Sequence, residues 1–124
     1  MIAVTFALFA LQAAVPDGRN VAAVEPATLN YWGCLDDGYS MGAKEGVDLN
    51  ALANEVVRKC ADDREQQGRA AMSALRGRGT LANDEERQQL IDLSFDALER
   101  DLKTIAATMA KSLNGNGVVQ NAQN

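Results

Sequence analysis

Two cysteines, Cys34 and Cys60, are the residues of this 124-residue chain whose types and spacing best suit chemistry. In an oxidising compartment they would join in a disulfide, and in a reducing one they would remain thiols that can exchange. Redox dithiols usually stand close together in sequence, as in C-x-x-C, whereas these two cysteines are far apart. The spacing therefore favours a structural disulfide over a redox pair.

Other catalytic groups are scarce, because the chain contains no histidine. Its absence excludes Ser-His and Cys-His catalysis, histidine-ligated zinc and a histidine pH switch. The adjacent acids Asp36-Asp37 and Asp62-Asp63 lie in predicted helices, where neighbours diverge by about 100° and do not converge on a metal or substrate. We therefore expect no enzymatic activity, no metal site and no cofactor.

The N-terminal segment is apolar up to Ala14 and is followed by Pro16. It is shorter than the roughly 20 residues that cross a bilayer, which is typical of an export signal. We expect residues 1–23 to be a signal peptide, cleaved after Ala14 or Ala23, and the mature protein to be periplasmic or secreted. The alternative is an N-terminal helix buried in the domain, and the lack of a preceding Lys or Arg leaves an upstream start codon open.

The net charge of the chain is −5 at pH 7, which argues against nucleic acid or an anionic membrane as a partner bound through bulk charge. A small basic patch, Arg69, Arg76 and Arg78, falls at a predicted helix end rich in glycine. We interpret it as a flexible turn. We expect no nucleic-acid partner and no membrane span after processing.

Three helices are predicted, so the fold class is all-α. The first runs from about residue 26 to 44, the second from just after Asp48 to about 76, and the third from the cap at 83 to 113. Asp48 is a good N-cap for the second helix, and Asn83 with Glu86 forms a capping box for the third. Together they make a helical domain over residues 24–114, and the polar residues 115–124 are expected to be a disordered tail.

The cysteine positions also predict a register. If the first two helices form an antiparallel hairpin that turns near Gly46, Cys34 and Cys60 lie equally far from the turn and face each other. The same register sets Gly38 opposite Val56 and Gly42 opposite Leu52. Packed helix axes usually stand about 8–10 Å apart, while a disulfide needs Cα atoms about 5.5 Å apart, so glycines beside the bridge would allow the closer approach.

The third predicted helix carries a heptad stripe of apolar residues: Ile91, Phe95, Leu98, Leu102, Ile105 and Met109. If the second and third predicted helices form an antiparallel hairpin that turns near residue 80, Val56 would meet Ile105 and Leu52 would meet Met109. The polar segment 62–68 of the second helix offers Phe95 and Leu98 no partner. We expect the start of the first helix to cover them with Leu29, Tyr31, Trp32 and Leu35. This closes a small three-helix up-down-up bundle, with one disulfide joining its first two helices.

The pattern Tyr31-x-x-Cys34, followed by a helix that bears Ala53 and ends in Cys60, resembles small uncharacterised exported proteins of Gram-negative bacteria. The resemblance covers the signal and residues 31–60, about half the chain. It implies periplasmic residence and a disulfide-bridged helical hairpin. It brings no functional residues with it.

The sequence thus predicts a non-enzymatic exported protein that acts by binding, with an envelope protein as a possible partner. Tyr31 and Trp32 are the candidate contact residues. The alternative is a self-associating, coiled-coil-like structural protein that uses the stripe of the third helix. Asp92, Glu99 and Asp101 beside that stripe disfavour a parallel homodimer, so we expect a monomer or a weak dimer.

Overall fold

The computed structural model describes residues 18–79 and 81–123, with side chains described between 20 and 113. Four helices make up these residues, which contain no strand: α2 (Gly18–Gly42), α3 (Leu49–Lys59), α4 (Ala61–Arg78) and α5 (Asp84–Gln123). The predicted all-α class is confirmed. The signal segment up to residue 17, including cleavage after Ala14, lies outside the described residues.

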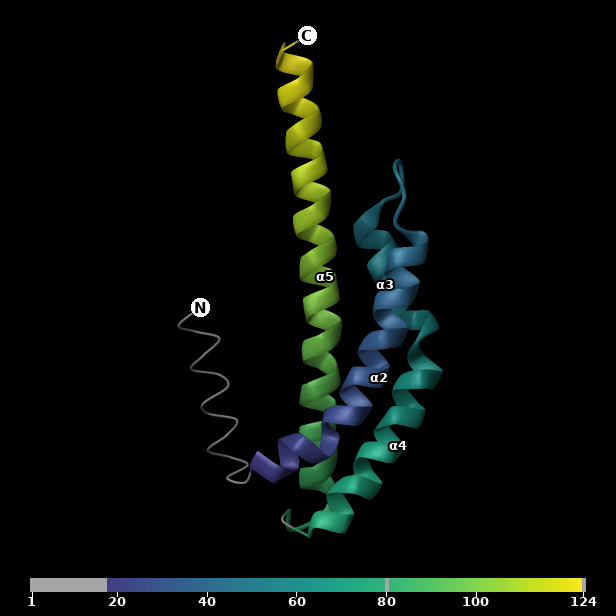
Figure 1. Cartoon of the computed structure of the whole chain (residues 1–124), viewed down its shortest axis with the longest axis vertical. Helices are drawn as coiled ribbons and strands as arrows, with labels where there is room; N and C mark the ends of the chain where they lie inside the picture. Colours follow the sequence, from purple (N-terminus) through teal and green to yellow (C-terminus); the bar gives the residue numbers. More distant parts are fainter. Residues whose placement is uncertain (1–17, 80, 124) are drawn as a thin grey trace.

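The prediction of three helices is wrong, because the second predicted helix divides at Cys60. Cys60 has φ −89° and ψ 9°, so it ends α3 and begins α4. The division has a packing reason. Helix α3 packs mainly against α5, whereas α4 packs mainly against α2. One straight helix would not follow both neighbours, and Figure 1 shows α4 running beside α2.

Helix α2 begins before Pro26, which was expected to start it. A proline inside a helix removes one backbone hydrogen bond and bends the helix, and the beginning of α2, purple in Figure 1, lies at an angle to the rest. The added turns are part of the core, since Ala23 and Val24 are buried. Cleavage after Ala23 would therefore cut within a packed helix.

The predicted turns and caps are confirmed. Gly46, in the turn between α2 and α3, has φ +86°, a conformation that glycine adopts without strain. Asp48 accepts hydrogen bonds from the backbone N–H groups of Asn50 and Ala51, as an N-cap does. Gly79 ends α4 in the left-handed conformation typical of a helix C-terminus.

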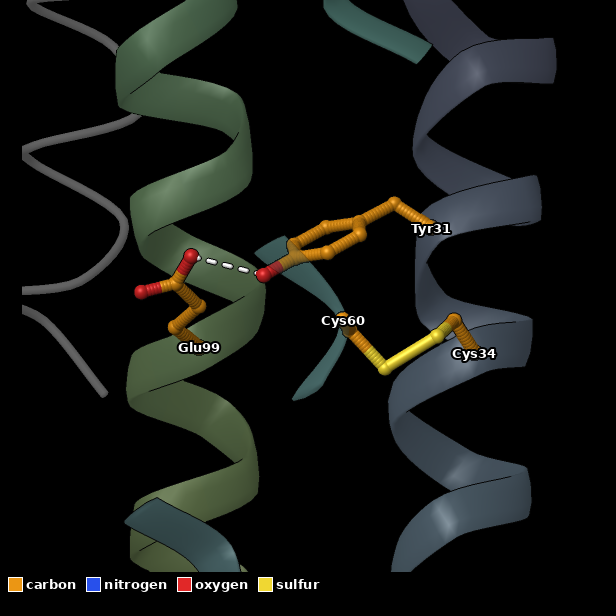
Figure 2. Close-up of a disulfide and its surroundings, with 4 residues drawn as sticks. All are labelled: Tyr31, Cys34, Cys60 and Glu99. Carbon is orange, nitrogen blue, oxygen red and sulfur yellow. Dashed lines mark hydrogen bonds between the residues drawn. A yellow bond between two sulfur atoms is a disulfide. The ribbon is translucent and has the colours of Figure 1, made fainter. Parts of the chain in front are cut away.

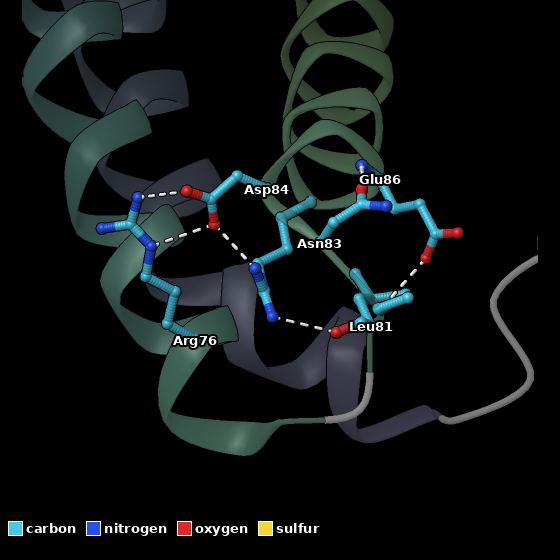
Figure 3. Close-up of polar contacts among 7 residues, drawn as sticks. Arg76, Leu81, Asn83, Asp84 and Glu86 are labelled. Atoms are coloured by element: carbon cyan, nitrogen blue, oxygen red, sulfur yellow. Dashed lines mark hydrogen bonds and ion pairs between the residues drawn. The ribbon is translucent and has the colours of Figure 1, made fainter.

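The start of α5 shows the predicted capping box (Figure 3). The Asn83 side chain accepts from the Glu86 N–H at 2.9 Å, and the Glu86 carboxylate accepts from the Ala82 N–H at 3.1 Å. The first bond satisfies an unpaired N–H group of the first helical turn, and the second reaches the residue just before the N-cap instead of the N-cap itself.

The stripe of α5 is buried at Ile91, Phe95 and Leu102 and partly buried at Leu98, and it then departs from the predicted heptad. Ala106 is fully buried, whereas Ile105 is 41% exposed and Met109 is 44% exposed. A straight helix has 3.6 residues per turn and drifts by about 20° per heptad, so the inward positions move one residue along the chain. The expected burial of Ile105 and Met109 against the second helix is therefore corrected.

Helix α5 also extends further than expected, because it does not end at Leu113 but continues to Gln123. Residues 115–124 were predicted to be a disordered tail. Each residue added to an existing helix adds one backbone hydrogen bond, and the glycines at 115 and 117 weaken this propagation without the block that a proline would impose.

Candidate protein-binding surface

The disulfide between Cys34 and Cys60 is formed, with Cα atoms 6.1 Å apart. Figure 2 shows that it links the middle of α2 to the junction of α3 and α4. The predicted pairing is thereby confirmed. The bridge fixes α2 at a residue adjacent to Gly33 and two positions from Trp32.

The predicted facing pairs beside the bridge are also confirmed. A Cβ atom added at Gly38 would lie 3.0 Å from a methyl group of Val56, and one added at Gly42 would lie 2.7 Å from a methyl group of Leu52. Side chains at these two positions would push α2 and α3 apart. Glycine at both positions therefore leaves room for the close approach of the two helices.

Tyr31 is not a surface residue. It is fully buried, its ring centroid lies 5.1 Å from that of Phe95, and its hydroxyl donates a 2.8 Å hydrogen bond to Glu99 (Figure 2). Trp32 points about 100° away from Tyr31 around the helix and is only partly buried, so the two side chains have different surroundings. The expectation that Tyr31 belongs to a partner-contact surface is corrected.

Phe95 is covered from α4 as well, contrary to the expectation for the polar segment 62–68. The guanidinium carbon of Arg64 lies 5.6 Å from the centre of the Phe95 ring, and the ring also packs near Gly68. Arg64 forms ion pairs with Glu99 and, at 3.0 Å, with Asp96. A long arginine can thus cover an aromatic ring while its charge meets carboxylates.

This polar cluster shifts two pKa values. Burial, and then the hydrogen bond to Glu99, raises the pKa of the Tyr31 hydroxyl well above its ordinary value. Burial alone would lower the pKa of Arg64, but its hydrogen bonds to Glu99 and Asp96 outweigh that effect and raise it. Tyr31, Arg64 and Glu99 thus bond to one another inside the bundle and form a structural cluster.

The basic patch predicted at the end of the second helix is largely neutralised. Arg76 donates to Asp84 at 3.0 Å (Figure 3), and Arg69 pairs with Glu65 at 3.1 Å. Hydrogen bonds from Arg76 and then Arg87 lower the pKa of Asp84 to about 2. Arg69 and Arg76 therefore stabilise local structure, and Arg78 takes part in no ion pair among the described residues.

An open groove of about 750 Å³ lies between α4 and α5. Arg64, Arg69 and Arg76 line it, but each already pairs with a carboxylate. The described residues include no group of three His, Cys, Asp or Glu side chains that could hold a metal ion. None of the described helices is both long and apolar enough to cross a membrane.

The outward face of α2 is different, since it combines apolar groups with open space. We name this face the α2 surface; its residues are Ala22, Pro26, Leu29, Trp32 and Gly33. Leu29 is 62% exposed, Trp32 is half-buried against the core, and a Cβ atom at Gly33 would meet nothing within 4 Å. Sequence reasoning included Trp32 but assigned Leu29 to the core.

Acidic side chains flank the α2 surface. Glu25, Asp36 and Asp37 are all exposed. No ion pair among the described residues involves any of these three carboxylates. The α2 surface is therefore an apolar patch with free negative charge at its edges.

Comparison of the chain with protein-family models, curated proteins and solved structures gives no match. Function is accordingly inferred from the geometry of the chain itself.

Proposed function

We propose that this protein is a non-enzymatic exported protein that acts by binding another protein through the α2 surface. The observation that carries the proposal is the exposure of Leu29, at 62%, beside Trp32 and the open position at Gly33. Large apolar side chains grouped with a tryptophan are typical of the centre of protein interfaces.

The disulfide supports this proposal because it makes the surface rigid. Cys34 follows Gly33 directly and is tied to Cys60, which is only 4% exposed. A surface that is already ordered loses less conformational entropy when it binds. The half of α2 that carries Trp32 is therefore prepared for binding without rearrangement.

The interactions of the ionisable side chains support binding rather than catalysis. Tyr31, Arg64 and Glu99 come together in the bundle, where the Glu99 carboxylate already pairs with both the Tyr31 hydroxyl and the Arg64 guanidinium. Arg64 also lines the groove between α4 and α5, but it is paired with carboxylates there. Catalytic groups need a free position within hydrogen-bond reach of a substrate.

Site-specific photo-cross-linking of the full chain in its native cells tests the proposal. A photoreactive residue at position 29 should give a discrete cross-linked product with another protein. Leu93 on α5 is the matched control, since it is an exposed leucine of similar exposure, at 50%. Absence of a product at position 29, or the same products at both positions, would refute the proposal.

Self-association is a second candidate function, favoured by the exposed end of the α5 stripe. Ile105, Met109 and Leu113 are 41%, 44% and 58% exposed. A second copy could cover them in a weak dimer. Light scattering over a range of concentrations tests this, with Ile105→Ser and Met109→Ser as the variants that should abolish any dimer.

A further inference from the structure

We infer that the partner of the α2 surface is a helix that places small and apolar residues over Gly33 and basic residues beside Asp36 and Asp37. This inference rests on the proposed function, and it adds the chemistry of the partner. Two independent features carry it: a glycine that the fold does not need, and carboxylates that nothing in the described structure neutralises.

The first feature is Gly33. Glycine inside a helix costs about 1 kcal/mol relative to alanine. The packing of α3 explains that cost at Gly38 and Gly42, where a Cβ atom would lie 3.0 Å and 2.7 Å from its neighbours. It does not explain Gly33, whose Cβ would meet nothing within 4 Å. A missing side chain on an open face allows a second backbone to approach closely.

The shape of the surface suits a helix. Ala22, Pro26, Leu29 and Gly33 are spaced four, three and four residues apart, so they follow one face of α2. Trp32 borders this face and is half-buried against the core. A helix lying along it would meet small groups at Gly33 and apolar groups at Leu29 and Trp32, as in the docking of an amphipathic helix on an apolar surface.

The second feature is charge. Asp36 and Asp37 lie about one turn beyond Gly33, and Glu25 lies near the other end of the face. All three are exposed and take part in no ion pair among the described residues. If a second copy of the chain bound through its own α2 surface, its carboxylates would lie near these carboxylates and repel them. A partner with Lys or Arg at the Asp36 end is favoured, because complementary charge steers association and sets orientation.

Two synthetic helical peptides without tryptophan test the inference on the full, disulfide-bonded chain. Both carry the same face of alanine, glycine and leucine, and one ends in three lysines while the other ends in three glutamates. Trp32 is the only tryptophan of the chain, so its fluorescence reports binding directly. The lysine peptide should bind and shift the emission of Trp32, and the glutamate peptide should bind at least tenfold more weakly.

Two variants then separate the two features. The double variant Asp36→Asn, Asp37→Asn should weaken binding of the lysine peptide about fivefold, as expected for exposed charge pairs. Gly33→Leu should weaken it more than tenfold by blocking the approach. Gly77→Leu is the matched control, because Gly77 lies in α4 and also has nothing within 4 Å of its Cβ position. Circular dichroism verifies that each variant is folded.

Three results would overturn the inference. The two peptides could bind equally well, neither could bind, or the lysine peptide could bind the Gly33→Leu variant as tightly as the unmodified protein. A cross-link from position 29 to another protein would still be expected after any of these results, because it does not depend on the chemistry of the partner helix. The cross-link therefore decides separately whether the α2 surface binds a protein at all.

Discussion

The rings of Tyr31 and Phe95 lie 5.1 Å apart, centre to centre, with their planes tilted by 44°. Both residues are fully buried, one on α2 and the other on α5. Tilted aromatic pairs at this separation add to the stabilisation that burial of their surface provides. This pair is one of the contacts between α2 and the long C-terminal helix, together with the hydrogen bond from Tyr31 to Glu99.

Replacement of Phe95 by alanine should therefore destabilise the protein strongly. Truncation of a large buried aromatic side chain to alanine typically lowers the free energy of unfolding by about 3–5 kcal/mol, because the cavity left behind does not fully collapse. Chemical denaturation measures the loss in free energy of unfolding. The control is Leu93→Ala, which removes a half-exposed side chain from the same helix and should cost less than about 1 kcal/mol. Similar losses for the two variants would contradict the assignment of Phe95 to the core.

Removal of the disulfide should lower stability without removing the helices. Cys34→Ser opens a loop whose ends are 26 residues apart, and the expected loss is about 2–4 kcal/mol in chemical denaturation. Reduction of the unmodified protein should give a loss of similar size. Thiol alkylation under denaturing, non-reducing conditions should label neither cysteine before reduction, and labelling of both would show that the bridge is not formed in the protein as made.

Alanine in place of three glycines of α2 should change stability in opposite directions. Gly33→Ala should stabilise by about 0.5–1 kcal/mol, because the new methyl group meets open space and favours the helix. Gly38→Ala should destabilise, since its Cβ would press on the short, β-branched side chain of Val56. Gly42→Ala should cost less, because the Leu52 methyl group that it meets is the end of a flexible side chain. Destabilisation by Gly33→Ala would show that the face of α2 is covered from within the chain.

The buried hydroxyl of Tyr31 should make stability fall at alkaline pH. Its pKa is raised in the folded state above the ordinary value of about 10, so the folded state holds this proton more tightly than the unfolded state. The stabilising contribution is complete below pH 10 and is lost as the pH rises towards the folded pKa.

Tyr31→Phe tests this by denaturation at several pH values. It should lower stability at pH 7 by about 1.5–3 kcal/mol, because Glu99 loses a donor. It should also reduce the decline of stability above pH 10. An unchanged alkaline decline would show that the Tyr31 hydroxyl is not the group responsible.

Register and caps followed from the sequence because they depend on local rules. The spacing of Cys34 and Cys60 from the turn placed them opposite each other, and the same geometry predicted Gly38 against Val56. Asp48 and Asn83 act on the nearest backbone N–H groups, so their roles need no knowledge of the rest of the fold.

The remaining features depend on contacts between helices that one segment does not reveal. The break at Cys60 reflects the different neighbours of α3 and α4. Arg64 reads as a solvated residue within the polar segment, but its long side chain reaches Phe95 and the carboxylates of α5. Tyr31 was expected both to cover Phe95 and to contact a partner, and the packing of α2 confirms the contact with Phe95 and leaves Tyr31 no exposed surface.

The position of the disulfide also has a consequence for the order in which the chain acquires structure. Cys34 and Cys60 both precede α4 and α5, and synthesis proceeds from the N-terminus. The loop between them can close while the C-terminal half is still being made. Helix α3 is then committed to α2 before α5, which packs on both, can compete for either of them. Where the bridge forms before α5 packs, it fixes the register of the α2–α3 hairpin on which the last helix then docks.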